Sequence, residues 1–224
     1  MDAKSSPMSL QLRVYVPDHP LVKHWLAIAR DKNTPTPLFK TAMKELSKWL
    51  TYEASRYWLP TLEAAVETPL APAAVTLIHP QAEIIAIPIL RAGLTLMEGA
   101  QEVITTSSVY HLGYKRNEET LAPYCYLNNL PEKFATDARV LLLDPMLATG
   151  GTMMAAMTEI TQRGIDPNNV RIVSVVAAPP ALQALSQTYA GLQVYTAIID
   201  PELNTQSYIV PGLGDAGDRA FGTH

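Results

Sequence analysis

The chain has 224 residues, of which 48% are hydrophobic and 17% are charged, and its formal net charge is −4. This length and composition predict an ordered protein with a sizeable core, and fit one α/β domain or one domain with an appended subdomain. The acidic balance gives no broad attraction to nucleic acid, so we expect small ligands whose phosphates are bound by local geometry. The single cysteine, Cys125, excludes an internal disulfide and a multi-cysteine metal site.

The sequence contains no apolar run of ~18 residues or more, the length that a membrane span needs. The first twenty residues also lack the charged start and apolar centre of a secretion signal. We therefore expect a cytoplasmic protein without a membrane partner.

Two amphipathic helices are predicted near the start, over residues 20–30 and 39–58, where apolar residues recur at helical spacing. One face of the second helix is formed by Phe39, Met43, Leu46, Leu50, Ala54 and Tyr57. An aromatic set there is typical of a core or a subunit interface, and comprises Trp49, Tyr52, Tyr57 and Trp58. We expect a homodimer or a larger homo-oligomer. Residues 1–17 match no pattern and are interpreted as an N-terminal extension.

The middle of the chain alternates between strand and helix patterns. Residues 60–80 are broken by prolines and predict a connection with at most one short strand. Four runs rich in Val and Ile then predict strands, at residues 84–90, 140–143, 170–176 and 194–199. Helical patterns separate or follow them, at residues 93–104, 152–163 and 181–189. This order is typical of an α/β protein with a mostly parallel sheet covered on both faces. Residues 204–224 are rich in Gly and Pro and have no strong period.

Charged residues follow three of the predicted strands directly: Arg91, Asp144 and Asp200. In open α/β sheets, ligands bind outside the carboxyl ends of the strands. Arg91 and Asp144 are therefore candidate site residues. Asp200 has no supporting motif and is interpreted as structural.

A phosphate site is predicted where the strand at residues 140–143 meets the next helix. The connecting residues 144–152 read D-P-M-L-A-T-G-G-T. Backbone N–H groups and the positive helix end point the same way at such a turn, and glycine lets the backbone approach a phosphate closely. Composition alone fits an ordinary strand-to-helix turn as well as it fits a phosphate site. The sequence excludes a Walker loop, which needs Lys after its last Gly, and the dinucleotide fingerprint G-x-G-x-x-G.

An acidic residue that ends an apolar strand and leads into A-T-G-G-T resembles the loop of type I phosphoribosyltransferases that binds phosphoribosyl diphosphate (PRPP). The form D-P-M-L-A-T-G-G is similar to that of their uracil-specific branch. Further stretches agree in order and spacing, and the resemblance covers nearly the whole chain after residue 18: HPLVKH (19–24), LTYEA (50–54), PILRAG (88–93), RNEET (116–120) and YIVPGLGDAGD (208–218). One departure is Lys115, because the family usually has Tyr directly before the flap arginine, and here Tyr114 lies one place earlier.

The resemblance implies the type I fold, with a central mostly parallel sheet flanked by helices and a C-terminal hood over the base. It implies transfer of the phosphoribosyl group from PRPP to N1 of uracil, giving UMP and diphosphate. Arg91 would meet the diphosphate, and Arg116 would reach it from a mobile flap. PRPP would be held by Asp144, Pro145, Met146, Leu147, Ala148, Thr149, Gly150, Gly151 and Thr152, with Asp144 facing the ribose hydroxyls. Uracil would be bound by Ile209, Gly214, Asp215 and Ala216, with Asp215 also near PRPP.

The chemistry fits these implied roles. Loss of diphosphate from the ribose develops positive charge on the sugar and negative charge on the leaving group, so the site needs Mg²⁺ and cations at the diphosphate. Mg²⁺ keeps several waters and binds substrate phosphates, so we expect it to be held by PRPP and water rather than by protein ligands. The resemblance also raises GTP as an effector.

Two alternatives stay open at this stage. Some proteins of this fold are RNA-binding regulators of pyrimidine operons, although the acidic balance of the chain counts against a basic face. Orotate phosphoribosyltransferase is the nearest enzyme alternative. The carboxylate of orotate needs a cation in the site. The presumed base loop has the acids Asp215 and Asp218, and only Arg219 lies near them in the sequence, which counts against orotate. The five histidines show no metal spacing or triad context and receive no catalytic role.

Overall fold

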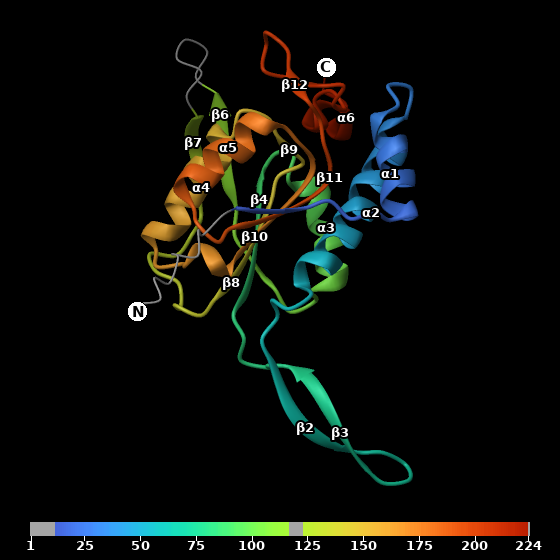
Figure 1. Ribbon diagram of the computed structural model, residues 1–224, viewed down its shortest axis with the longest axis vertical. Coiled ribbons are helices and arrows are strands. Elements are labelled where there is room, and N and C mark those ends of the chain that lie inside the picture. Colours follow the sequence, from blue (N-terminus) through green and yellow to red (C-terminus); the bar gives the residue numbers. More distant parts are fainter. Residues whose placement is uncertain (1–11, 117–122, 224) are drawn as a thin grey trace, which may run out of the picture.

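The computed structural model describes residues 12–116 and 123–223, which contain a nine-stranded central sheet (Figure 1). Among the strands that the described residues form in this sheet, only the β6–β7 pair is antiparallel. The mostly parallel α/β fold is confirmed. Along the sheet, the strands run in the order β1 (Arg13–Tyr15), β11 (Gln193–Ile199), β10 (Val170–Ala177), β8 (Arg139–Leu143), β4 (Ile84–Leu90), β6 (Leu112–Arg116) and β7 (Pro123–Asn128), with β5 (Ser108–Val109) beside β4 and β9 (Met146–Leu147) beside β10.

Helices cover both faces of the sheet (Figure 1). On one face lie α1 (Pro20–Arg30), α2 (Thr36–Ser55) and α3 (Leu94–Val103), and on the other lie α4 (Gly151–Gln162) and α5 (Pro179–Thr188). The 3₁₀ turn η1 (Pro167–Asn169) precedes β10. All eight residues of β10 are buried, because helices pack on both sides of it. No helix in the described ranges is long and apolar enough to cross a membrane.

Residues 60–80 differ from the prediction of a connection with one short strand. They form an antiparallel arm of two strands, β2 (Thr61–Glu67) and β3 (Pro72–Ile78), which projects from the body (Figure 1). The strand pattern is weak in the sequence because many of its apolar positions are alanine, which favours strands little. At the turn, Thr68 Oγ1 donates to the Ala71 carbonyl at 2.7 Å.

The second helix begins and ends three residues earlier than predicted, at Thr36 and Ser55. It ends at Ser55, and Tyr57 adopts a left-handed backbone with φ 71° and is 99% exposed. The prediction that the helix continues to Trp58, with Tyr57 on its buried face, is therefore wrong. The chain turns because Trp58 is buried against the body, where its Nε1 donates to the Asn169 carbonyl at 3.1 Å.

The two ends of the chain hold elements that the sequence patterns did not reveal. Arg13–Tyr15, within the presumed extension, forms the edge strand β1 beside β11. The C-terminal segment holds a small two-stranded sheet of β12 (Glu202–Leu203) and β13 (Ile209–Val210), followed by α6 (Ala216–Phe221). Each of these elements is too short to produce a hydrophobic period.

Candidate functional site

The phosphate cradle predicted at residues 144–152 forms a strand-to-helix turn at the carboxyl edge of the sheet. Gly150 is the N-cap of α4, with φ 87°, and its carbonyl accepts the N–H of Met154 at 2.8 Å. The N–H groups of Gly151, Thr152 and Met153 therefore precede the first intrahelical bond and have no intrahelical acceptor. Together with the helix dipole, they give the turn the donors and the positive end that an anion site needs.

The two glycines of this turn have different constraints. A Cβ at Gly150 would lie 3.0 Å from the Cα of Ala181, and its positive φ disfavours any side chain. A Cβ at Gly151 would meet no atom closer than the Cδ of Pro123 at 3.8 Å. The fold itself therefore requires glycine at 150. At 151 the bare backbone leaves open space for a ligand.

The cradle is hollowed, and Asp144 lines this hollow together with residues 146–153. Its backbone N–H donates to the Val173 carbonyl at 3.2 Å, which fixes the residue beside β10. Burial raises the pKa of the Asp144 carboxyl to about 7, against the opposing hydrogen bond from the Met146 N–H. Near neutral pH this carboxyl exchanges between a proton donor and an acceptor.

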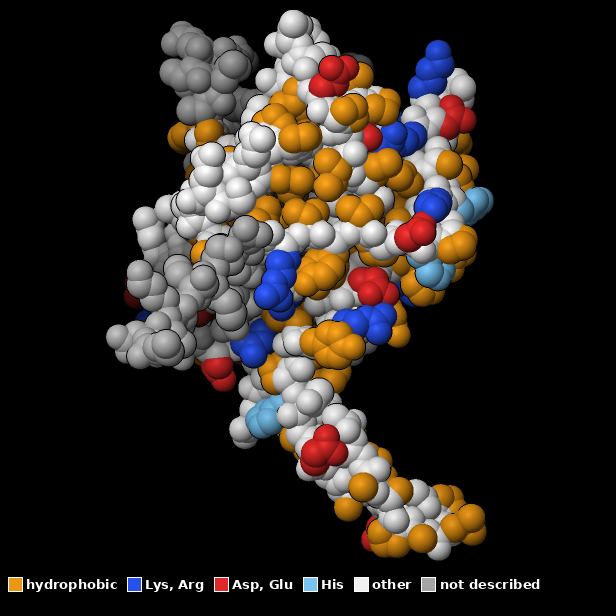
Figure 2. Space-filling view, in the orientation of Figure 1, with side chains coloured by type: hydrophobic (Ala, Val, Ile, Leu, Met, Phe, Trp, Pro, Cys, Tyr) orange, Lys and Arg blue, Asp and Glu red, His pale blue; other side chains and the backbone are white. Residues whose placement is uncertain are grey.

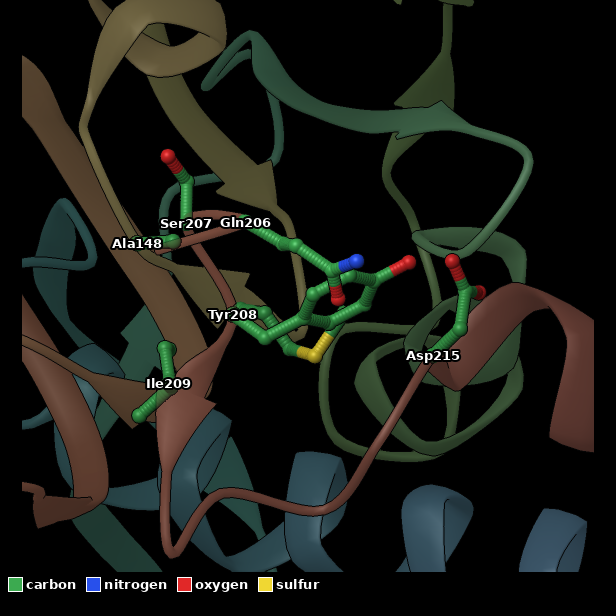
Figure 3. Close-up of a pocket in the computed structure, with 7 residues that line it drawn as sticks. Ala148, Gln206, Ser207, Tyr208, Ile209 and Asp215 are labelled. Carbon is green, nitrogen blue, oxygen red and sulfur yellow. The ribbon is translucent and has the colours of Figure 1, made fainter. Parts of the chain in front are cut away.

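A second hollow of about 310 Å³ adjoins the cradle (Figure 3). Gln206 and Tyr208 extend into it from the turn between β12 and β13, and Asp215 faces it from the start of α6. We call this hollow the ring pocket, and its lining residues are Met146, Ala148, Gln206, Ser207, Tyr208, Ile209 and Asp215. Met146 and Ala148 also line the cradle, so the two hollows share a wall.

The structure brings Ile209 and Asp215, both predicted to bind the base, together in this pocket. Its lining also includes Gln206, Ser207 and Tyr208, which the sequence patterns did not single out. The available signal was Asn204, because Asn commonly bonds the backbone two residues on. Here its Oδ1 accepts the N–H groups of Gln206 and Tyr208 at 3.0 and 2.9 Å. Of the other residues predicted to bind the base, Gly214 and Ala216 do not line the pocket. Gly214 has φ 75° and Ala216 is fully buried.

Arg91 lies at the end of β4 and contacts the base loop. Its Nη2 donates to the Asp218 carboxylate at 3.2 Å, and Asp215 Oδ1 accepts the Asp218 N–H at 2.9 Å. Among the described contacts Arg91 does not pair with Glu98 on α3, which accepts from the Nζ of Lys44 at 2.9 Å. Asp218 therefore links Arg91, the candidate for binding the diphosphate, to the base loop.

The strand that leads into the expected flap borders a further hollow of about 440 Å³, which Arg91 also lines. Burial raises the pKa of the Tyr114 hydroxyl, while the Nζ of Lys115 lies 5.5 Å from the ring centroid of Tyr126. Arg116 is the last residue of β6. Its side chain and the flap residues 117–122 lie outside the described part of the chain.

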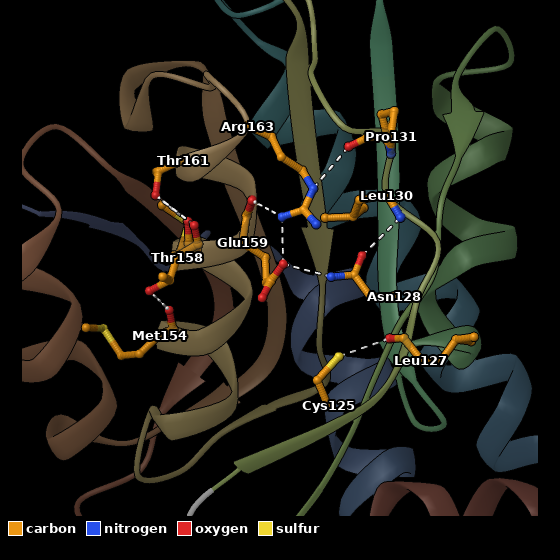
Figure 4. A network of polar contacts seen from close by, with 11 residues as sticks. Cys125, Leu127, Asn128, Leu130, Pro131, Met154, Thr158, Glu159, Thr161 and Arg163 are labelled. Atoms are coloured by element: carbon orange, nitrogen blue, oxygen red, sulfur yellow. Dashed lines mark hydrogen bonds and ion pairs between the residues drawn. The ribbon is translucent and has the colours of Figure 1, made fainter.

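A network of polar contacts fixes the base of the β6–β7 hairpin to α4, the helix that begins at the cradle (Figure 4). Glu159 on α4 accepts from the Nδ2 of Asn128 at 2.7 Å and from Arg163 at 2.6 Å. Arg163 also donates to the carbonyl of Pro131 at 3.0 Å. The flap strands and the cradle are therefore held as one unit.

Arg219, the cation of the base loop that orotate would need, is bonded to backbone carbonyls. The Nη1 of Arg219 donates to the carbonyls of Ala29 and Leu213, and its Nη2 donates to the carbonyl of Asp31. Its guanidinium also lies 4.3 Å from the ring centroid of Phe39. Arg219 therefore fastens the C-terminal segment to α1 and α2 and is absent from the lining of the ring pocket.

Within the described ranges, no three His, Cys, Asp or Glu side chains gather as a metal site. A helix start that can bind phosphate, beside a pocket at the carboxyl edge of a parallel sheet, defines an α/β protein that binds phosphorylated small molecules. Comparison with known proteins gives the particular family. Residues 16–223 match the family model described as uracil phosphoribosyltransferase. The chain belongs to the uracil phosphoribosyltransferase family.

Individual relatives agree over nearly the full length. A uracil phosphoribosyltransferase of Nostoc is 64% identical and one of Synechocystis is 62% identical, each over 96% of this chain and 100% of the relative. A solved structure of a protein from Aquifex aeolicus is 38% identical, with a TM-score of 0.84 over 93% of this chain and 97% of that one.

Proposed function

We propose that the chain is a pentosyltransferase of pyrimidine salvage, which transfers the 5-phosphoribosyl group of PRPP to N1 of uracil and releases UMP and diphosphate. The observation that carries this proposal is the wall that the cradle shares with the ring pocket, formed by Met146 and Ala148. A phosphate in one hollow and a flat base in the other would be the two ends of one nucleotide.

In this proposal residues 144–152 bind PRPP. The N–H groups at the start of α4 receive the 5-phosphate, assisted by the hydroxyls of Thr149 and Thr152. Asp144 accepts hydrogen bonds from the ribose hydroxyls when its carboxyl is ionised. Arg91 binds the diphosphate from the end of β4, and Arg116 joins it when the flap closes.

Uracil is bound in the ring pocket. Ile209 offers one wall and its backbone, and Asp215 faces the ring from the start of α6. Gly214 and Ala216 act through the backbone of the same loop, which the capping bond of Asp215 holds in place. Tyr208 and Gln206 extend into the pocket beside them (Figure 3). These contacts hold N1 of uracil toward the ribose.

The reaction needs charge stabilisation more than covalent chemistry from the protein. As the bond between the ribose and the diphosphate breaks, Arg91 and Arg116 stabilise the negative charge on the leaving group. Bound Mg²⁺ would neutralise further charge on the diphosphate. The site has two candidate carboxylates, Asp144 and Asp215, and such a sparse donor set fits an ion held mainly by substrate phosphates and water.

Neither alternative function gains support. The guanidinium of Arg219 donates to backbone carbonyls. The carboxylate of orotate would therefore lack the cation that it needs in the base loop. The RNA-binding alternative rests on fold analogy alone. A nucleic-acid shift assay with a salt titration tests it, and salt-sensitive RNA binding that UMP modulates would favour it.

Four further properties remain proposals. We infer a homodimer or larger homo-oligomer, because the β2–β3 arm exposes Val66, Leu77, Ile78 and, at 97%, Leu70. We treat residues 1–224 as one phosphoribosyltransferase domain. A cytoplasmic location and GTP as an effector stay predictions of the sequence.

One assay tests the function. Purified protein is incubated with PRPP, Mg²⁺ and one of uracil, orotate, cytosine or hypoxanthine, and the nucleotide product is followed by chromatography. We expect UMP from uracil and little product from the other bases. Faster formation of orotidine monophosphate than of UMP would overturn the assignment.

A further inference from the structure

A lysine lies at the carboxyl edge of the sheet, beside two candidate site residues that follow neighbouring strands. Strands β8, β4 and β6 are adjacent and parallel, and the register of the last two pairs Leu90 with Gly113 (Figure 1). Arg91 directly follows β4, and Asp144 directly follows β8. Lys115 is two residues beyond Gly113, near the end of β6. Strand register therefore brings Lys115 to the edge where ligands of α/β sheets bind.

The same end of the β6–β7 hairpin adjoins the cradle. Lys115 pairs with Tyr124 in the ladder, and the next pair joins Arg116 to Pro123. The Cδ of Pro123 lies 3.8 Å from the position that a Cβ of Gly151 would take at the start of α4. Lys115 is therefore one ladder pair away from a residue that borders the phosphate site.

Lys115 and Arg91 line one hollow of about 440 Å³. We call it the flap-strand hollow, and its lining residues are Leu90, Arg91, Tyr114, Lys115 and Tyr126. These described residues include two cations and no acid. On the face shown in Figure 2, by contrast, most Lys and Arg side chains have an Asp or Glu side chain close by. Two cations that share a hollow without an acid in its lining favour an anionic ligand.

The ring of Tyr126 holds the ammonium group of Lys115 at this hollow. The Nζ lies 5.5 Å from the ring centroid, within the ~6 Å range of cation–π attraction. The register of the hairpin shifts between Gly113 and Tyr114, which leaves Tyr126 as an extra residue on β7. Such a bulge re-aims a side chain. Gly113 makes room for the ring, because a Cβ there would lie 2.5 Å from the Cζ of Tyr126.

The two cations suit the two kinds of contact that a diphosphate offers. A guanidinium binds two phosphate oxygens at once, whereas an ammonium group acts as a compact point charge. Arg91 uses its Nη2 for Asp218 at 3.2 Å, and its guanidinium has five N–H donors in all. Donors of Arg91 therefore remain for a ligand beside Lys115.

We propose that Lys115 binds the diphosphate group of PRPP, and of the released product, together with Arg91, and that the ring of Tyr126 positions its ammonium group. The proposal rests on the proposed function and adds a residue to it. Lys115 is the position at which this chain departs from the family pattern, so no role is carried over to it from the resemblance.

Isothermal titration with inorganic diphosphate and Mg²⁺ tests the proposal, because this probe has neither ribose nor base. Lys115→Met should bind it about tenfold more weakly than the wild type, through loss of a charge-assisted contact. Lys115→Arg keeps the charge and should stay within about threefold of the wild type. Unchanged affinity in a folded Lys115→Met protein would overturn the proposal. A loss that Lys115→Arg shows equally would overturn the assignment to charge.

Lys133→Met is the matched control. It removes an exposed lysine from the loop between β7 and β8, so the net charge of the protein changes by the same amount. Diphosphate affinity should stay at the wild-type value. A loss equal to that of Lys115→Met would show that net charge alone governs binding and would overturn the site.

Steady-state kinetics separate this role from general damage and from the proposed function. The diphosphate is present in both the ground state and the transition state, so Lys115→Met should raise the PRPP KM about tenfold, change kcat less, and leave the uracil KM near the wild-type value. A wild type that binds no diphosphate and forms no UMP would overturn both proposals. A wild type that does both, matched by Lys115→Met, would overturn the role of Lys115 alone.

Two further variants test the positioning role of Tyr126. Tyr126→Phe keeps the ring and should keep diphosphate affinity, whereas Tyr126→Leu removes the ring and should weaken binding about threefold. In the Lys115→Met protein, Tyr126→Leu should have no further effect, because the ring acts through the ammonium group. An additive loss in the double variant would show that Tyr126 does not act through Lys115.

Discussion

The guanidinium of Arg30 lies 2.6 Å from one carboxylate oxygen of Asp200, and the other oxygen of Asp200 accepts the N–H of Gly212 at 2.8 Å. Asp200 is 2% exposed. The pair therefore connects the end of α1 to the loop that runs from β13 to Asp215. The interpretation of Asp200 as structural agrees with these contacts, and its position gives it an indirect influence on the ring pocket.

Arg30→Met should loosen this loop. It leaves the Asp200 carboxylate buried without its partner, at a cost to folding stability of about 3–5 kcal/mol. The uracil KM should rise at least about tenfold while PRPP affinity stays near that of the wild type, since the cradle makes no contact with this pair. Lys23→Met, which breaks an exposed pair with Asp18 on the same helix, is the control. An equal rise in both constants would show general destabilisation instead.

The contrast between the two cradle glycines gives a second prediction. Gly151→Val should keep the fold, because its Cβ has room, and should weaken PRPP binding by several charge-assisted hydrogen bonds of ~1.5–3 kcal/mol each. Gly150→Val should lower Tm as well, through its φ of 87° and its contact with Ala181. Titration with PRPP and thermal unfolding measure the two effects. Normal PRPP affinity in a folded Gly151→Val protein would refute the cradle.

PRPP binding should depend on the ionisation of Asp144. Burial raises the pKa of its carboxyl to about 7, so the group is mostly protonated at pH 6 and mostly ionised at pH 8. Only the carboxylate accepts from two ribose hydroxyls. PRPP should therefore bind about tenfold more weakly at pH 6 than at pH 8. The phosphates of PRPP titrate in the same way with either protein, whereas Asp144→Asn has no carboxyl at this position to titrate. An identical pH profile of PRPP binding in the wild type and in Asp144→Asn would therefore contradict the role of Asp144.

The parallel sheet was predictable because its strands are buried on both faces. Such strands read as continuous Val and Ile runs, and the strand predicted at residues 84–90 has the same bounds as β4. The β2–β3 arm was missed because it contributes nothing to the core and its pattern is diluted by alanine and proline. Local periodicity cannot reveal elements whose stability comes from the body they contact, such as the edge strand β1.

The candidate site likewise has one part that the sequence could predict and one part that it could not. The cradle was predictable because it is one continuous segment whose geometry depends on its own glycines and on the strand before it. The ring pocket joins Met146 to Tyr208 and Asp215, which are distant in sequence. The contacts of Arg219 that hold the C-terminal segment are made with Ala29 of α1 and Thr36 of α2. Asn204 is a local signal for the turn at residues 204–208, but no local pattern indicated that Gln206 and Tyr208 extend from that turn into the pocket. Nor did any pattern indicate that Arg219 donates to backbone carbonyls.

The flap gives a fourth prediction. Arg116→Ala should lower kcat at saturating substrates by more than about tenfold, because a charge met mainly in the closed state stabilises the transition state. Lys115→Ala removes the neighbouring cation, which lies over Tyr126, and should have a smaller effect. Steady-state kinetics with both substrates varied provide the measurement. A change restricted to the uracil KM in Arg116→Ala would count against the flap role.

The last prediction concerns discrimination between bases. The segment from residue 209 to residue 218 offers few long polar side chains, so backbone N–H and C=O groups should read the edge of uracil. Cytosine replaces an acceptor and a donor of that edge with a donor and an acceptor. Each mismatched buried group costs ~1–3 kcal/mol, which gives at least about a hundredfold preference for uracil in kcat/KM.

Gly214 tests this backbone readout, because its φ is 75° and a Cβ there would meet only the Cδ of Arg219, at 3.6 Å. Gly214→Val should therefore act by shifting the backbone, abolishing uracil use while sparing PRPP binding. Gly164→Val is the matched control, since Gly164 has φ 97°, open space around it and a place outside the ring pocket. It should share the strain and keep the uracil KM. Full activity in Gly214→Val, or use of cytosine within about tenfold of uracil, would show that the loop does not read the base through its backbone.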